Sequence, residues 1–103
     1  MNESQVEQEV QQKNLTATRV TPADIDACIV AEAYYIFPNT TVTVCCLTLK
    51  NGFAITGESA CASASNFDAE LGMKIARGNA RDKIWALEGY SLRNRLSTKG
   101  VTK

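Results

Sequence analysis

The sequence predicts an α+β fold in which one long helix covers a small antiparallel sheet. Three observations carry this prediction. Two β-rich stretches, residues 29–37 and 42–50, flank the turn sequence Pro38-Asn39-Thr40. Asn51-Gly52 follows, which is the strongest short signal for a hairpin, and a third β-rich stretch, residues 53–60, comes after it. A long amphipathic pattern comes next, and strands followed by helices are typical of an α+β domain.

The 103 residues suffice for one small domain with a modest core. We assign residues 1–20 to a flexible polar arm, residues 21–98 to the single α+β domain and residues 99–103 to a tail. The arm is rich in Gln and Glu. Its Val6 and Val10 are four residues apart, which fits a short helix as well as a frayed end.

A short helix is expected over residues 22–29, before the first strand. Thr21 is a good N-cap, and Pro22 suits the first helical position. Asp24 and Asp26 then lie near the positive end of the helix dipole.

The hairpin turn Asn51-Gly52 predicts a two-residue type I′ turn, in which both central residues have positive φ. The expected cross-strand pairs are therefore Lys50 with Phe53, Thr48 with Ile55, and Cys46 with Gly57. The sequence Gly57-Glu58-Ser59 places a Glu beside a Ser without any base. We interpret it as a turn or bulge and not as a catalytic dyad.

The amphipathic pattern predicts the main helix from Phe67 to Leu87 or Glu88, capped by Ser65 or Asn66 and ended by Gly89. A second short helix is expected from about Ser91 to Ser97. At ~100° per residue the main helix carries two apolar stripes, whereas packing on one sheet needs only one. The first stripe is Phe67, Leu71, Ile75, Gly78 and Trp85, and the second is Ala69, Met73, Ala76, Ala80, Ile84 and Leu87.

Only one of the two stripes can pack on the sheet, so the other needs a different partner. The N-terminal helix, the C-terminal helix and a second subunit are all open. We favour a subunit interface, because a small domain has little else to cover the surface, and a two-fold dimer is the commonest arrangement.

Charge is divided unevenly along a chain whose net charge is zero. Eight of the eleven basic residues follow position 73 against two acidic ones, so that this part carries +6 and the first 73 residues carry −6. Arg77 and Arg81 repel each other at i and i+4, and their guanidinium groups match phosphate geometry. With Lys74 they form a basic stripe between the two apolar ones. The pattern indicates an anion site, to which Arg93 and Arg95 add charge.

An ordinary solvated face is the competing interpretation of these basic residues. In it, Lys74 pairs with Glu70, and Glu88 reaches toward Arg81. Phe67 and Trp85, together with Phe53, are interpreted as core residues, with a base-stacking platform as the alternative.

The chain has no histidine, Walker A loop, G-x-G-x-x-G motif or zinc-ligand spacing, so we expect no enzyme, metal or cofactor. Cys28, Cys45, Cys46 and Cys61 are interpreted as apolar fillers in a reducing compartment. A reactive thiol is the alternative. No apolar run predicts a membrane span and no leader precedes the domain, so a cytoplasmic location is expected.

About half of the chain, from Val44 to Leu92, resembles a known family. The pattern includes Thr56-Gly57-Glu58-Ser59-Ala60-Cys61, Asn66-Phe67-Asp68, and Leu87-Glu88-Gly89-Tyr90. This combination is similar to the small tailed-phage protein family named after products of coliphage N-four and a Shigella phage, which includes the first Thoeris anti-defence protein.

The resemblance implies a phage protein that acts in the cytoplasm of the infected host as an oligomeric sponge. Such proteins bind cyclic ADP-ribose isomers, and some bind cyclic trinucleotides, without cleaving them. The candidate ligand residues, by position and chemistry, are Arg77, Arg81, Asn79, Lys74, Phe67, Arg93 and Arg95. The alternative is an oligomeric interaction protein that binds a host or phage protein. Nucleic acid is a disfavoured partner, because the net charge is zero.

Overall fold

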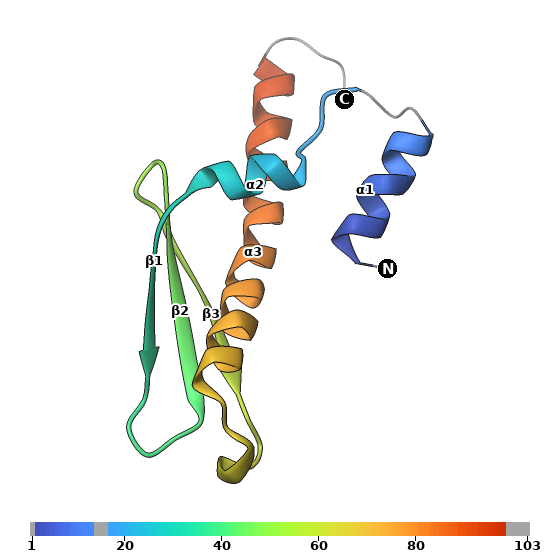
Figure 1. Cartoon of the computed structure of the whole chain (residues 1–103). Coiled ribbons are helices and arrows are strands. Elements are labelled where there is room, and N and C mark those ends of the chain that lie inside the picture. The colour runs from blue at the N-terminus through green and yellow to red at the C-terminus, as the bar shows by residue number, and fades with distance from the viewer. Residues whose placement is uncertain (1, 14–16, 99–103) are drawn as a thin grey trace.

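The computed structural model describes residues 2–13 and 17–98 (Figure 1). The predicted α+β fold is confirmed: α3 lies across one face of a sheet whose strands run antiparallel in the order β1-β2-β3. The predicted tail, with Lys99 and Lys103, lies outside the described residues. The elements in chain order are α1 (Glu3–Gln12), α2 (Pro22–Cys28), β1 (Ile29–Ile36), β2 (Val42–Leu49), β3 (Ala54–Ala60), the 3-10 turn η1 (Ala64–Asn66) and α3 (Ala69–Thr98).

Capping boxes start the two N-terminal helices. In α1 the side chain of Asn2 accepts a hydrogen bond from the Gln5 backbone amide, and the Gln5 side chain accepts one from the Asn2 backbone amide. The segment therefore forms the short helix and not a frayed end. In α2 Thr21 and Asp24 form the same reciprocal pair, as the predicted cap requires, and the helix ends one residue before the expected limit.

The hairpin between β2 and β3 differs from the prediction by one residue. The Leu49 amide donates to the Phe53 carbonyl at 2.8 Å, so Leu49 pairs with Phe53 across a three-residue loop. Within this loop only Gly52 has positive φ, at 91°, which matches a turn followed by a left-handed glycine and not a type I′ turn. The observed pairs include Leu47 with Ile55, Cys46 with Thr56, and Cys45 with Gly57. Because side chains alternate between the two faces of a sheet, this one-residue shift in the pairing places Gly57 on the face that contacts α3.

Gly57 is where the sheet and the helix come closest. A Cβ atom on Gly57 would lie 2.2 Å from the Ala80 nitrogen and 2.6 Å from the Ala76 oxygen. Gly57 occupies a regular position inside β3, so the expected turn or bulge at Gly57-Glu58-Ser59 is wrong. The glycine is required because two backbones meet there. Around it the core gathers the inward residues of β2 and one line along α3, with Ile25: Thr43, Cys45, Leu47, Leu49, Gly72, Ala76, Ala80 and Ile84.

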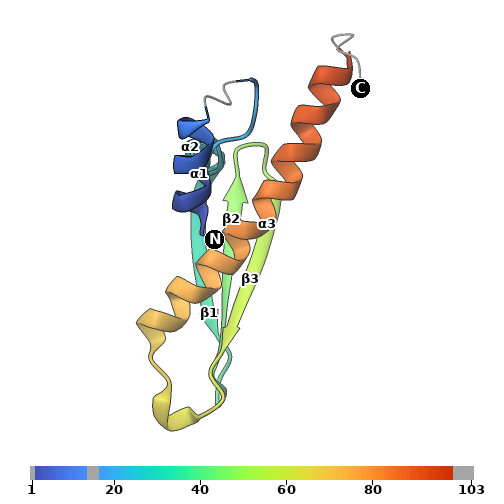
Figure 2. The ribbon, with the colours of Figure 1, turned by 90° about the vertical axis from the view of Figure 1, so that its right-hand side faces the viewer.

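α3 is one continuous helix where two were expected. Asp68 accepts from the Leu71 amide at 3.1 Å and acts as the cap in place of Ser65 or Asn66. Gly89 does not end the helix: its φ is not positive, as a terminating glycine requires, and no proline follows it. The helix therefore continues to Thr98, and Figure 2 shows its C-terminal end extending past the sheet.

The two predicted apolar stripes meet different environments. Ala76, Ala80 and Ile84 pack on the sheet. In the other stripe, Leu71 is 54% and Ile75 47% exposed, whereas Trp85 is half-buried beside α1. Of the possible partners, the N-terminal helix thus reaches one end of this stripe, and Leu71, Ile75 and Gly78 are uncovered. None of the described helices is long and apolar enough to cross a membrane.

Candidate functional site

Arg81, the last residue of the predicted basic stripe, is held by acidic groups from two other helices. Its Nη1 lies 2.6 Å from Glu3 of α1, and its Nε lies 2.9 Å from Asp26 of α2. Its Nη2 donates to the Pro22 carbonyl at 3.3 Å. The hydrogen bonds to Glu3 and then Asp26 raise the pKa of Arg81. The acidic N-terminal segments therefore supply the anions that this arginine needs.

Arg77 is paired as well, with the first strand. Its Nε donates to Glu32 of β1 at 3.1 Å, and the Tyr34 hydroxyl donates to the other oxygen of that carboxylate. The hydrogen bonds from Tyr34 and then from Arg77 hold the pKa of Glu32 below its ordinary value of 4.5. Arg77 and Arg81 thus point to separate carboxylates, and their mutual repulsion is relieved within the chain.

Asn79 and its neighbour Lys83 cover the outer edge of β3. The Asn79 amide donates to the Glu58 carbonyl at 2.9 Å, and the Lys83 ammonium donates to the Thr56 carbonyl at 2.7 Å. The hydrogen bond between Leu49 and Phe53 sets the alternation along the ladder, so that residues 55, 57 and 59 bond to β2 and the carbonyls of Thr56 and Glu58 face away from it. Both side chains therefore protect an edge that would otherwise present free acceptors.

Phe67 and Lys74 lie near the N-terminal end of α3. Phe67 lines a hollow of about 190 Å³ together with Leu71 and Ile75. The Lys74 side chain is exposed and, within the described part of the chain, forms no ion pair. The expected pairs of Lys74 with Glu70 and of Arg81 with Glu88 are not among the ion pairs there.

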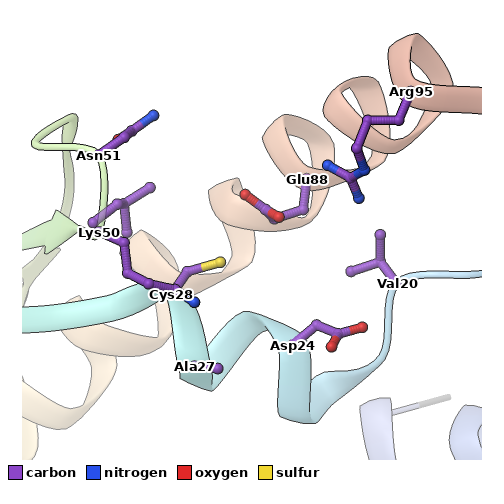
Figure 3. Close-up of a pocket in the computed structure, with 9 residues that line it drawn as sticks. Val20, Asp24, Ala27, Cys28, Lys50, Asn51, Glu88 and Arg95 are labelled. Carbon is purple, nitrogen blue, oxygen red and sulfur yellow. The ribbon is translucent and has the colours of Figure 1, made fainter. Parts of the chain in front are cut away.

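Arg93 and Arg95 lie near the other end of α3. Arg93 is exposed and has no ion pair within residues 2–13 and 17–98. Arg95 donates to Ser91 at 3.0 Å and lines a pocket of about 340 Å³ between α2, the hairpin loop and α3 (Figure 3). The other residues lining this pocket are Val20, Asp24, Ala27, Cys28, Leu49, Lys50, Asn51 and Glu88.

The pocket around Arg95 mixes both signs of charge, with Asp24 and Glu88 against Lys50 and Arg95. Burial, followed by the nearby Glu88, raises the pKa of the Cys28 thiol, so this cysteine stays protonated near neutral pH. Sequence reasoning missed this pocket because its residues come from three segments with no common spacing.

The seven candidate residues therefore fall into two classes. Arg77, Arg81 and Asn79 are engaged by other parts of the chain, whereas the rest lie toward the two ends of one helix. Lys74 and Arg95 are separated by about 30 Å along the helix axis, at ~1.5 Å per residue. A single protomer cannot bring them to one small ligand.

The family model described as Phage protein (N4 Gp49/phage Sf6 gene 66) family matches residues 20–96. The chain belongs to this phage protein family. The match extends over α2, the sheet and most of α3, and it leaves α1 outside. No curated protein and no solved structure matches the chain. The expected resemblance is thus confirmed at the level of the phage family.

Proposed function

We propose that this phage protein binds cyclic nucleotide signals, namely cyclic ADP-ribose isomers and also cyclic trinucleotides, and sequesters them uncleaved in the host cytoplasm. In this proposal the protein is no enzyme, and two subunits complete each site. The observation that carries the proposal is the uncovered stripe of α3. It has Leu71 and Ile75 near one end, beside the Phe67 hollow, and the exposed Arg93 near the other.

The stripe suits an antiparallel pair of α3 helices. At ~100° per residue, Arg93 lies on the same face of α3 as Leu71 and Ile75. A Cβ on Gly78, in the middle of this face, would meet nothing within 4 Å, so another backbone can approach. A two-fold pair that crosses between Gly78 and Asp82 sets Phe67 of one subunit beside Arg93 of the partner subunit. The aromatic ring and the cation then share one site.

The chemistry of such a site fits a phosphorylated nucleotide. An arginine binds phosphate with two parallel hydrogen bonds, and Phe67 offers a face for stacking. A sponge must compete with the receptor of the signal, which requires nanomolar affinity or about −12 kcal/mol. Burial of the ligand between two subunits strengthens each polar contact, because water is excluded. None of these contacts requires a catalytic group.

A binding and recovery experiment tests the function. The protein is mixed with cyclic ADP-ribose isomers and cyclic oligonucleotides, the shift in melting temperature is recorded, and the ligand is recovered by heating and analysed by chromatography. A large shift with intact ligand is expected. A converted ligand would mean an enzyme. The absence of a shift across the panel would reject the nucleotide proposal in favour of an interaction protein.

Complementation between two variants tests whether the site is shared. Phe67→Ala and Arg93→Ala should each abolish binding as homodimers. Mixed after unfolding and refolding, they form heterodimers in which one site carries both changes and the other carries none. Binding should return at about a quarter of the wild-type number of sites. No recovery in verified heterodimers would show that the two residues do not act across an interface.

A further inference from the structure

The helix α1 is held against the body of the protein by charge and not by packing. None of its residues is buried, and Val6 is 45% exposed. Its side-chain hydrogen bonds to the rest of the described chain come from Glu3 and Glu7 alone. A helix of ten residues is marginal in isolation. The two ion pairs that hold it are only partly buried, with 37% of the Glu3 and 28% of the Glu7 side chain exposed. α1 is therefore attached in a way that allows it to leave.

The surface under α1, by contrast, is held in place by contacts that do not involve α1. Arg81 is only 15% exposed, and Asp26 and Pro22 orient it independently of α1. Arg81 and Trp85, one turn apart on α3, both donate to the same oxygen of Glu3, at 2.6 and 3.1 Å. Their two donors converge on one carboxylate.

A second carboxylate is bound one helical turn further along α1. Arg19 grips Glu7 with two hydrogen bonds, at 2.9 and 2.8 Å. The side-chain hydrogen bond to Arg19 holds the pKa of Glu7 below its ordinary value. Two arginines thus recognise carboxylates at positions i and i+4 of one helix.

Between these two anchors lies a hollow that α1 does not fill. It measures about 410 Å³ and is lined on the α1 side by Val6 and Val10 and on the other side by Val20, Pro22 and Trp85. Valine side chains are too short to reach across it, so contacts are lost on both walls. A helix with larger apolar residues at these two positions would fit better than α1 does.

The family match begins at Val20, so α1 lies outside the shared unit, whereas Val20, Pro22, Arg81 and Trp85 lie inside it. We propose that this groove docks an acidic amphipathic helix of a partner protein, and that α1 occupies it as a weak internal competitor. The partner helix carries carboxylates at i and i+4 and residues of leucine size or larger at i+3 and i+7. This proposal does not rest on nucleotide binding.

The test uses the full-length chain and a labelled peptide of residues 1–13. In one peptide the sequence is native, and in the other it carries Val6→Leu and Val10→Leu. The protein variant Glu3→Gln/Glu7→Gln removes the two anchors of α1. Fluorescence polarisation should show about tenfold tighter binding of the leucine peptide by this variant than by the wild type, because the internal competitor is weakened. The leucine peptide should bind about tenfold tighter than the native one, since two more methylene groups are buried.

Two controls separate docking in the groove from adhesion elsewhere. A leucine peptide with Gln at positions 3 and 7 should lose most of its affinity. Trp85→Phe, placed in the Glu3→Gln/Glu7→Gln protein, keeps an aromatic ring but lacks the N–H donor and should weaken binding severalfold. Trp85 is the sole tryptophan, so its emission also reports occupation of the groove. Equal binding by wild type and opened variant, or equal binding of acidic and neutral peptides, would overturn the proposal.

Discussion

The two halves of α3 have the same secondary structure but different surroundings. From Gly72 to Ile84 every fourth residue is buried against the sheet. From Trp85 to Thr98 no residue is buried, and the helix extends past the sheet (Figure 2). One face of the first half is therefore fixed by the sheet, whereas the second half has no face buried in this way. Burial therefore separates structural residues from candidate functional ones better than residue type does, because Leu71 and Ile75 in the first half stay about half exposed.

The arginines show the same division. Arg77 and Arg81, in the packed half, are tied to Glu32, Glu3 and Asp26. The exposed Arg93, in the projecting half, forms no ion pair within the described chain. Arg77 and Arg81 drew attention in the sequence by their spacing, but this spacing serves the assembly of the protomer. The projecting half therefore supplies the arginine of the proposed site, whereas Phe67 lies beside the start of the packed half.

The largest expected effect concerns the contact that fixes the packed half. Gly57→Ala should destabilise the fold by about 3 kcal/mol or more, because its Cβ would overlap the backbone at Ala80. Urea unfolding measures the change. Gly78→Ala is the matched control at protein concentrations too low for dimers, since its Cβ meets nothing within the protomer and should stabilise the helix by up to ~1 kcal/mol. Equal effects at the two glycines would show that the close contact at Gly57 does not fix the packed half of α3.

The uncovered stripe gives the next largest effect. Leu71→Lys/Ile75→Lys should weaken self-association by about a hundredfold, because two half-exposed apolar side chains are replaced by charges at the proposed interface. Sedimentation measures the dimer, and unfolding at low protein concentration should change by less than ~0.5 kcal/mol. If the protomer itself loses stability, the stripe belongs to its own core and not to an interface.

A smaller effect is expected at the buried hydroxyl of Thr43, which faces Gly72 near the start of the packed half. Its Oγ1 has no hydrogen-bond partner among the described residues. Thr43→Val keeps the shape and removes an unsatisfied polar atom, so it should stabilise the fold by about 1 kcal/mol. Thermal and urea unfolding measure this gain. A loss of stability would instead indicate a hydrogen bond to this hydroxyl.

The sequence was sufficient for the fold class, because β-branched runs, the Asn51-Gly52 signal and helical periodicity are local. The hairpin register and the end of the main helix were predicted wrongly, for different reasons. The hairpin register follows from Gly57 meeting Ala80, a contact that no local pattern contains. Gly89 does not end the main helix, because the cost of ~1 kcal/mol for a glycine is too small to stop a helix whose other residues have high helix propensity.

The candidate site was less accessible to sequence reasoning than the fold. The residue types of the basic stripe were informative, but their partners Glu3, Asp26 and Glu32 lie 45 to 78 residues away. Such distant pairs leave no periodic signal. The charge asymmetry between the two parts of the chain was the one available hint, since it makes internal pairing across them favourable.

The smallest expected effect is a difference in pH dependence between the packed and projecting arginines. The folded-state pKa of Glu32 is lowered, chiefly by Tyr34 and then by Arg77. Its contribution to the stability of the fold is therefore present above pH 4.5 and is lost as the pH falls through the lowered pKa. Wild type should therefore lose more stability between pH 7 and pH 3 than Glu32→Gln does. Arg93→Gln should keep the wild-type slope, because no described carboxylate pairs with Arg93. Urea unfolding at several pH values measures the three slopes. A flattened slope in Arg93→Gln would place an acidic partner on the projecting half and remove the distinction between the two halves.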